Sequence, residues 1–396
     1  MSNPLTDGTE HEGYELTRLA SADNFRDVAG TGYPTYDGGR LRTGVLFRSN
    51  ELQLSDTDAG SLADLGIRDV LDLRDHQEVE AHPDVEVPGA TWTHVRVPGI
   101  PMDDVATLTS REAGLATMKR VYRIFVEDEG ARGAFGDLLA RLAHAEHPQL
   151  FHCTAGKDRT GWASALLLRV AGVPEATVLE DYLLTNRFDG TRTKYLTMVR
   201  EHLGEEKVGV YETVMVADAA YLAEADAAVA EHLSRTRATA FTPAEITVCH
   251  SAKHALSGVL LTLTEPGDEV LLLLPAWVSY FEMVRFAAGT PVAVESRTDL
   301  GPDLDALRRA ITPRTRGLMI NSPCNPSGYV LTPEEVAALC DLAAEHDLWI
   351  LSDEIYSRLV YDGTPFASPV QVSDDARART ILADGASKAF AMTGYR

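Results

Sequence analysis

Short runs of apolar residues alternate along this chain with longer segments in which apolar residues recur every three or four positions. A short apolar run predicts a buried strand, and the longer spacing predicts an amphipathic helix. In the first half, strands are predicted at residues 45–48, 70–73, 93–97 and 149–152, and helices at about 112–146 and 162–170. Strands that alternate with helices are typical of a parallel sheet flanked by helices, so this half predicts an α/β fold.

The same alternation returns in the second half, after a polar segment at residues 234–239 that has no apolar pattern. Strands are predicted at 269–274, 317–321, 348–352 and 380–383, and helices at 277–287, 304–311 and 333–346. An Ala-rich helical stretch at 217–233 ends just before the polar segment. The pattern therefore predicts a polar N-terminal arm at 1–15, a first domain at 16–235 and a second α/β domain at 236–396.

Length, charge and cysteine content limit the cellular setting and the partners. The chain has 396 residues, enough for two domains, and its net charge of −23 repels nucleic acid and anionic membranes. Its four cysteines show neither metal-ligand spacing nor a disulfide framework, which fits a reducing compartment. No apolar stretch approaches the ~20 residues of a transmembrane helix, and the N-terminus does not resemble a signal peptide. We therefore expect a cytoplasmic protein with no nucleic-acid partner, no transmembrane segment and no bound metal.

The first candidate site is the segment HCTAGKDRT at residues 152–160, which joins a predicted strand to a predicted helix. The backbone N–H groups of such a loop, together with the positive end of the following helix, form a cradle for an anion. Gly156 permits the backbone angles that a tight loop requires. Cys153 begins the loop and lies in its positive field, which favours a thiolate nucleophile.

Two further side chains of this segment complete the predicted chemistry. The planar guanidinium of Arg159 matches two phosphate oxygens, and its charge stabilises a phosphoryl group during transfer. The Thr160 hydroxyl can donate a hydrogen bond to the sulfur when sulfur becomes the leaving group. The segment thus predicts phosphoryl transfer through a cysteinyl-phosphate intermediate. The alternative is a buried structural cysteine beside a surface arginine.

The spacing of Cys153 and Arg159, followed by Thr160, resembles that of the protein tyrosine and dual-specificity phosphatases. Three other segments, NFRDV at 24–28, LFRS at 46–49 and GIRDVLDLR at 66–74, are similar to the bacterial tyrosine/serine phosphatase family. The resemblance implies a phosphatase-type central sheet flanked by helices, a cysteine-dependent mechanism without a cofactor, and a phosphorylated protein as substrate.

The resemblance leaves the general acid and the substrate class open. The candidates for the acid are Asp103 or Asp104, in the loop after a predicted strand, and Asp158 within the cradle; each could instead be a plain surface carboxylate. The pattern that includes Gly156 and Lys157 is similar to phosphatases that accept phosphoinositides. A second cation at the cradle would favour a polyanionic substrate, and the alternative is that Lys157 is a solvated lysine.

The second half carries three segments with residues suited to pyridoxal phosphate: NSPCNPSG at 321–328, SDEIY at 352–356, and GASKAF at 385–390 with MTGYR at 392–396. A lysine at a strand end can form a Schiff base with this cofactor, and an aspartate at a neighbouring strand end can hold its ring nitrogen protonated. Residues 246–396 resemble fold type I aminotransferases of the aspartate aminotransferase class, and hence an incomplete α/β large domain of a pyridoxal-phosphate transferase.

This second resemblance implies a role for each residue of the cofactor site and a homodimer through this half. By that resemblance, Lys388 forms the Schiff base, Asp353 binds the pyridinium nitrogen, Asn325 and Tyr356 bind the phenolic oxygen, Trp277 stacks on the ring, Arg396 binds the phosphate, and Ser251 and Ala252 supply backbone donors to it.

The second half also departs from that family. A phosphatase-like domain replaces the family's N-terminal segment, and the sequence stops at Arg396, before the further strand and the small domain that carries the substrate-binding arginine. We therefore expect weak or absent cofactor binding and no transamination. Three functions remain in competition: a phosphomonoester hydrolase acting through Cys153, which the sequence favours, an aminotransferase acting through Lys388, and a non-catalytic fusion that only binds ligands.

Overall fold

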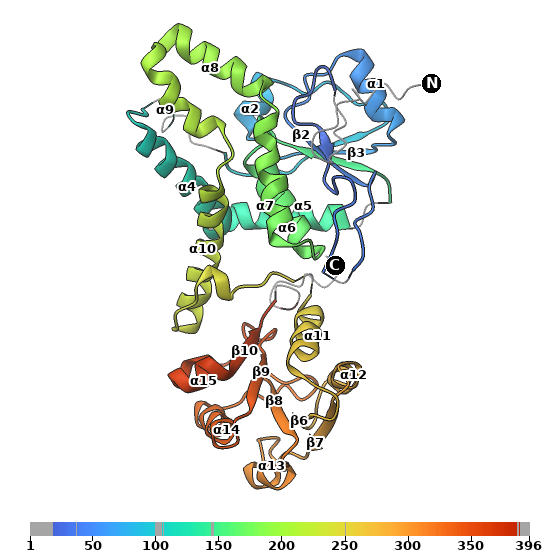
Figure 1. Ribbon diagram of the computed structural model, residues 1–396, viewed down its shortest axis with the longest axis vertical. Helices are drawn as coiled ribbons and strands as arrows, with labels where there is room; N and C mark the ends of the chain where they lie inside the picture. The colour runs from blue at the N-terminus through green and yellow to red at the C-terminus, as the bar shows by residue number, and fades with distance from the viewer. Residues whose placement is uncertain are drawn as a thin grey trace. The chain divides into compact units, whose positions relative to one another are not determined.

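The chain forms two compact units, which are shown in the computed structural model of Figure 1. The structure describes residues 19–36, 38–99, 105, 107–143, 146–249, 251–385 and 388. The first unit extends to His232 and includes Thr242–Val248, and the second contains Leu233–Phe241 and the residues from Cys249 onward. Each unit has its own sheet and its own hydrophobic core, so each is described by itself.

The first unit contains a five-stranded sheet with the strand order β1-β2-β5-β3-β4. The strands are β1 (Arg26–Asp27), β2 (Leu46–Ser49), β3 (Asp69–Asp72), β4 (Thr91–His94) and β5 (Gln149–His152). All pairs are parallel except β1 with β2. The central strand β5 is buried along its whole length, and its last residue pairs with Ser49 on one side and Asp72 on the other. Three strands therefore end together at one edge of the sheet, which is where sites form in such folds.

The helices of the first unit cover this sheet and its outgoing loops (Figure 1). They are α1 (Asp56–Asp64), α2 (His76–Ala81), α4 (Arg111–Glu127), α5 (Glu129–Ala143), α6 (Arg159–Val170), α7 (Glu175–Leu184), the 3₁₀ turn Thr185–Arg187, α8 (Gly190–Leu203), α9 (Glu205–Met215) and α10 (Ala219–Arg237). The single helix expected at 112–146 is two helices, because Asp128 has an extended backbone and its carboxylate accepts the Ala131 N–H at 2.8 Å.

Helix α10 continues through residues 234–237, which the sequence pattern places outside any helix. Its last turn carries Arg237, a buried residue whose guanidinium pairs with Glu354 at 2.8 Å and with Asp384 at 2.7 Å. Arg237 and both carboxylates belong to the second unit, in which each carboxylate directly follows a strand. The apolar pattern ends before the helix does, because these last residues are held by ion pairs rather than by apolar contacts.

The second unit is a parallel five-stranded sheet with the order β10-β9-β8-β6-β7. Its strands are β6 (Glu269–Leu273), β7 (Thr290–Val294), β8 (Thr315–Asn321), β9 (Trp349–Asp353) and β10 (Thr380–Ala383). Its helices are α11 (Ala252–Leu263), α12 (Ser279–Phe286), α13 (Leu304–Ala310), α14 (Pro333–Glu345) and α15 (Asp374–Arg379), with a 3₁₀ turn at Pro369–Gln371. A further 3₁₀ turn, Pro243–Glu245, belongs to the first unit. Strand β7 was not predicted, because this edge strand is largely half-exposed or exposed and lacks a continuous apolar run.

Both faces of the second sheet are buried, which the alternation of side chains explains. Leu271 lies in the cluster with the apolar residues of α13 and α14, whereas Val270 and Leu272 lie in the cluster with those of α11 and α12. Successive residues of a strand point to opposite faces, so a sheet covered on both faces needs unbroken apolar strands. The two α/β sheets confirm the predicted fold class.

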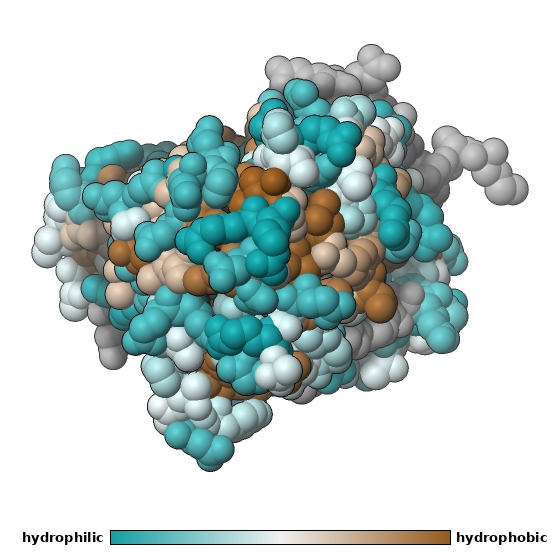
Figure 2. Space-filling model, turned by 90° about the horizontal axis from the view of Figure 1, so that it is seen from below, coloured by the Kyte–Doolittle hydropathy of each residue, from teal (hydrophilic) through white to brown (hydrophobic). Residues whose placement is uncertain are grey.

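Some apolar side chains remain exposed. Figure 2 shows hydrophobic areas among hydrophilic ones on one face of the molecule. In the second unit, Val278 and Phe286 at the two ends of α12 are 75% and 74% exposed. None of the helices in the described part of the chain is long and apolar enough to cross a membrane.

Candidate active site

The anion cradle forms between the end of β5 and the start of α6. Cys153 follows the strand directly, and Arg159 is the first residue of the helix. Gly156 has a φ of +66°, and a Cβ atom there would lie 2.6 Å from the backbone oxygen of Ser49. Only glycine combines this backbone conformation with such a close approach to β2. The sequence therefore folds the segment into the tight loop that the motif predicts.

Cys153 lines a cavity of about 450 Å³ and is only 2% exposed. Lys157, Asp158 and Arg159 line the same cavity. Its walls are mostly apolar and come from α4, α8 and α9, with Val121, Phe125, Val199, Leu203, Val214 and Met215 among the lining residues. A ligand must therefore pass apolar walls before it reaches the sulfur.

Arg159 is held by a carboxylate that sequence reasoning missed. Its Nη1 and Nη2 atoms donate to Glu78 of α2 at 2.6 and 2.7 Å, and the Thr154 hydroxyl donates to the same carboxylate. Burial would raise the pKa of Glu78, but the hydrogen bonds and charge of Arg159, with help from Thr154, lower it to about 2. Glu78 therefore stays ionised and orients the guanidinium.

The only sequence signal for Glu78 is local. Asp75 and Glu78 form a capping box at the start of α2, where Glu78 accepts the Asp75 N–H at 2.7 Å. Such a pair predicts the start of a helix and says nothing about a distant partner. The contact with Arg159 joins residues that are 81 positions apart.

Lys157 and Asp158 form a buried pair inside the cradle. The Lys157 ammonium lies 2.5 Å from Asp158 Oδ1, and the Tyr122 hydroxyl donates to the same oxygen at 3.2 Å. Lys157 is 2% exposed and Asp158 is 8% exposed, so the alternatives of a solvated lysine and a plain surface carboxylate are wrong for these two residues. Burial raises the pKa of Tyr122 well above its usual value, and the neighbouring Tyr182 and Asp158 raise it further, so Tyr122 stays a neutral donor.

The other predicted residues of the first site differ in what the structure says of them. The Thr160 hydroxyl is buried, and none of the described residues forms a hydrogen bond with it, which leaves it available to the sulfur. Asp103 and Asp104 lie outside the described residues. The structure thus brings Cys153, Asp158 and Arg159 together around one cavity.

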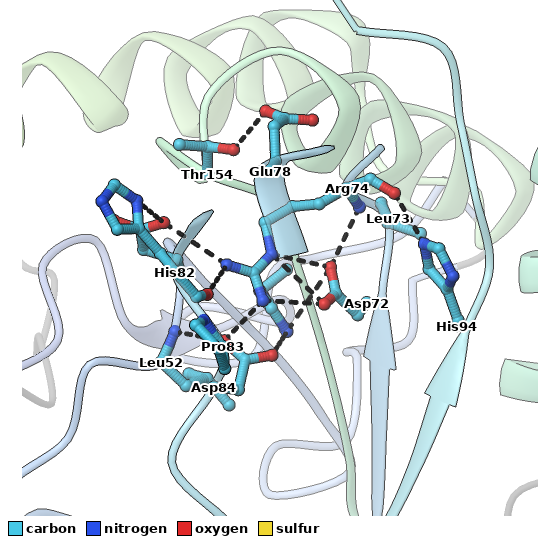
Figure 3. Close-up of polar contacts among 12 residues, drawn as sticks. Leu52, Asp72, Leu73, Arg74, Glu78, His82, Pro83, Asp84, His94 and Thr154 are labelled. Atoms are coloured by element: carbon cyan, nitrogen blue, oxygen red, sulfur yellow. Dashed lines mark hydrogen bonds and ion pairs between the residues drawn. The ribbon is translucent and has the colours of Figure 1, made fainter. Parts of the chain in front are cut away.

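A buried ion network supports the end of β5 beside the cradle (Figure 3). The Arg74 guanidinium lies 2.8 Å from Asp72 Oδ2 and 2.9 Å from Asp84 Oδ1, and it donates to the His82 carbonyl at 2.7 Å. Asp84 Oδ2 lies 3.0 Å from His152 Nε2. Burial would raise the pKa of Asp84, but the contacts with His152 and Arg74 lower it to about 2.

Asp72, Asp84 and His152 offer ligand atoms within 4.8 Å of one another, a geometry that could hold a metal ion. The guanidinium of Arg74 already lies against both carboxylates and supplies the positive charge that a metal would bring. We therefore interpret the cluster as an ion network that fixes the strand end just before Cys153.

In the second unit, a polar cluster lies at the carboxyl ends of β8 and β9. The Tyr280 hydroxyl donates to Asp353 Oδ2 at 2.7 Å, and Asn321 Nδ2 donates to the Asp353 carbonyl at 3.0 Å. Burial raises the pKa of Asp353, although the hydrogen bonds from Tyr280 and the Ile355 N–H act to lower it. Burial also raises the pKa of Tyr356, while a hydrogen bond with Asn325 opposes it. The structure thus brings Asp353, Asn325 and Tyr356 together, with Tyr280 as an added member.

The remaining cofactor candidates surround this cluster in part. The centroids of the Trp277 and Tyr280 rings lie 5.4 Å apart, and the Lys253 ammonium lies 4.7 Å from the centroid of the Trp277 ring. Ser251 caps α11 by accepting the His254 N–H at 3.1 Å, and Ala252 begins that helix, an arrangement suited to a phosphate. Lys388 is half-buried, and Arg396 lies outside the described residues.

Two family models match this chain. Residues 17–253 match the tyrosine phosphatase family, and residues 214–396 match aminotransferase class I and II. The two matches share residues 214–253, which include helix α10. Both resemblances that the motifs suggested are thereby confirmed.

Several curated aminotransferases match the second half. A probable aspartate/prephenate aminotransferase of Thermus aquaticus is 47% identical over 171 residues, covering 43% of this chain and 44% of the relative. The aspartate aminotransferase of Bacillus subtilis is 41% identical over 179 residues, covering 44% of this chain and 45% of the relative. A solved structure of Thermus thermophilus aspartate aminotransferase with maleate is 47% identical with a TM-score of 0.41, covering 43% of this chain and 44% of that one. The chain thus spans less than half the length of these relatives.

Proposed function

This chain belongs to the tyrosine phosphatase family, and from that premise we propose that its first unit hydrolyses phosphomonoesters through a cysteinyl-phosphate intermediate. The Cys153 sulfur attacks phosphorus, so that an S–P bond forms while the P–O bond to the leaving group breaks. A carboxyl group, for which Asp103, Asp104 and Asp158 are the candidates, gives the leaving oxygen a proton. Water then attacks the phosphorus and gives a proton to the carboxylate left by the first step, the S–P bond breaks with its electron pair returning to the sulfur, and inorganic phosphate leaves. The observation that carries the proposal is the meeting of Cys153 and Arg159 in the lining of one cavity.

We propose phosphotyrosine as the preferred substrate. Cys153 is buried beneath apolar walls, so the phosphate must be presented on a long and largely apolar side chain. An aromatic ring gains free energy along such walls, and a phosphoserine side chain has no ring to make these contacts. A phosphoinositide is the second candidate, since Lys157 lines the same cavity, but its charge is already paired with Asp158.

The proposed function is tested by steady-state hydrolysis of a phosphotyrosine peptide, a phosphoserine peptide and a phosphoinositide. We expect kcat/KM to be at least about 10²-fold higher for the phosphotyrosine peptide than for the phosphoserine peptide. A substrate without the ring loses its contacts with the apolar walls, which costs ~3 kcal/mol of transition-state stabilisation. Vanadate should inhibit as a phosphate mimic, and metal chelators should not. Equal rates on phosphotyrosine and phosphoserine would contradict the substrate class, and no hydrolysis of any of the three would contradict the function.

The general acid has a separate test. Asp158 is anchored through Oδ1 by Lys157 and Tyr122, and no described residue donates to its Oδ2 atom, which is therefore available to a leaving group. We expect Asp158→Asn to lower kcat by about 10²-fold for substrates with poor leaving groups, to lower it less for good ones, and to flatten the basic limb of the pH profile. Asp103→Asn and Asp104→Asn are compared in the same assay. If one of them shows this pattern and Asp158→Asn does not, the acid is in the loop.

For the second unit we propose pyridoxal phosphate as the ligand. When bound, this cofactor supplies an electron sink for amino-acid chemistry. The buried carboxyl group of Asp353 would face the ring nitrogen, and Asn325 with Tyr356 would face the phenolic oxygen. The chain spans less than half the length of its aminotransferase relatives, and the proposal is limited to binding.

We expect this binding to be weak. The Tyr280 hydroxyl already donates a hydrogen bond to Asp353, and the Lys253 ammonium lies over the Trp277 ring. The side chains of Tyr280 and Lys253 must therefore move before the cofactor ring can bind there. Titration of pyridoxal phosphate into the full chain, followed by visible absorbance, should give half-saturation at about 1 mM or above, or ~4 kcal/mol of binding free energy. Lys388→Ala should remove the absorbance. A tight, Lys388-dependent yellow complex that aspartate bleaches would instead support a transaminase.

A further inference from the structure

The cradle is held from behind by two side chains of the segments NFRDV and LFRS. Arg48 Nη2 donates to the Gly156 carbonyl at 2.8 Å, and Asn24 Nδ2 donates to the same oxygen at 2.9 Å. In a planar trans peptide the carbonyl and the next N–H point in opposite directions. A Gly156 carbonyl fixed toward Arg48 therefore turns the Lys157 N–H toward the opposite side, where the anion would lie.

These two side chains belong to a buried charged cluster that the proposed mechanism does not use. Arg48 is 0% exposed, and its Nη1 lies 3.1 Å from Asp181 Oδ2. The Arg26 guanidinium lies 3.5 Å from the other oxygen of Asp181, and the Tyr33 hydroxyl donates to that oxygen at 3.1 Å. Two guanidinium groups thus share one carboxylate, which leaves the cluster with a charge of +1.

The positive charge persists at neutral pH. Burial and the nearby charge of Arg26 lower the pKa of Arg48 to about 9, while the negative charges of Asp181 and Cys153 act in the opposite direction. A charge with little water around it is poorly screened and acts over a longer range than an exposed one. The unbalanced charge is therefore felt at the cradle, whose loop carbonyl Arg48 contacts directly.

We propose that Arg48 is a second cation of the oxyanion site: a positioning residue that aligns the loop through the Gly156 carbonyl and stabilises the bound anion through its unbalanced charge. The proposal rests on the proposed phosphatase function and adds a cation that does not touch the substrate. It also explains why an arginine stands at the end of β2, where a buried apolar residue would fill the space without the cost of desolvating a charge.

A purely structural ion cluster makes a different prediction, and the sign of the charge separates the two. If the cluster only braces the fold, removing either charge loosens the loop and weakens anion binding. If the net charge matters, removing Arg48 weakens binding, whereas neutralising Asp181 leaves more positive charge and strengthens it. Asparagine at position 181 keeps the shape of the side chain and one acceptor oxygen.

The experiment measures inhibition of aryl-phosphate hydrolysis by tungstate, a phosphate mimic, in the full chain and three variants. We expect Arg48→Gln to raise the inhibition constant about tenfold, or ~1.4 kcal/mol, and Asp181→Asn to lower it. Arg48→Lys keeps the charge and a donor, so we expect it within about threefold of wild type. If a melting curve shows that Arg48→Gln does not fold, Arg48→Lys becomes the decisive variant. A tenfold weakening of tungstate inhibition in Arg48→Lys overturns the proposal.

Two other outcomes also overturn the proposal: a weakening in Asp181→Asn that matches that of Arg48→Gln, or wild-type tungstate binding in a folded Arg48→Gln. Failure of the proposed function looks different, since the wild-type chain would then neither hydrolyse the aryl phosphate nor bind tungstate. A wild type that does both, with variants that miss the expected signs, removes only the role of Arg48.

Discussion

Replacing Cys153 with serine is expected to lower aryl-phosphate hydrolysis by roughly 10⁴-fold or more, because a serine hydroxyl is not ionised at neutral pH and is a far weaker nucleophile. The cradle should survive, since its shape depends on Gly156 and on the Arg48 hydrogen bond to the Gly156 carbonyl rather than on the sulfur. The variant should therefore still bind phosphate. Both quantities can be measured on one preparation, the first by steady-state hydrolysis and the second by calorimetric titration of phosphate.

Cys249→Ser is the matched control. Cys249 belongs to the second unit and is partly buried, and this burial raises the pKa of its thiol. Its replacement should leave hydrolysis unchanged. Turnover in Cys153→Ser near the wild-type rate would rule out a thiolate mechanism, and an equal loss in Cys249→Ser would show that the assay reports general damage to the chain.

The cradle could be predicted from the sequence because its parts are contiguous. β5 was predicted at its observed bounds, and the loop at 153–158 follows it without interruption. The start of α6 was placed too late, at 162 rather than Arg159, because Thr160 and Gly161 do not continue the apolar pattern. A nucleophile and its phosphate-binding arginine six residues apart leave a local signature that needs no knowledge of the fold.

The residues that support the cradle could not be predicted in the same way. Glu78, Asp84 and Arg48 come from segments that are separate in sequence, and they meet the cradle only because β2, β3 and β5 end at one edge of the sheet. Each has an ordinary local explanation in the sequence, such as a helix cap or the end of a strand. Their role depends on the strand order, which hydrophobic periodicity does not specify.

The residues around the cofactor cluster show the same limit. Asp353 is the last residue of β9, and Asn325 lies in the loop that follows β8, so the apolar runs place both near strand ends. Tyr280 lies on α12, and its contact with Asp353 joins residues 73 positions apart, so only the folded sheet reveals that it already occupies that carboxylate. The family resemblance names the residues, and the structure adds which of them are engaged with one another.

Replacing Arg159 with lysine is expected to lower kcat/KM for an aryl phosphate by roughly 10³-fold, although the charge is kept. The guanidinium donates from Nη1 and Nη2 to the two oxygens of Glu78, and the same planar fork matches two oxygens of a phosphoryl group. A lysine ammonium is a point donor on a flexible stem and cannot reproduce this geometry. The measurement is kcat/KM at a fixed pH, with the binding of tungstate as a second readout.

Glu78→Gln separates the orientation of Arg159 from its chemistry. The amide keeps one acceptor oxygen for the guanidinium, and the arginine itself remains, so we expect a loss of no more than about tenfold. Because the pKa of Glu78 is about 2, its carboxylate is ionised throughout the working pH range, and the pH profile of this variant should keep the wild-type shape. If Arg159→Lys were no more damaging than Glu78→Gln, charge alone would suffice at this position. The two-point grip of Arg159 on the phosphoryl group would then be the part of the mechanism to abandon.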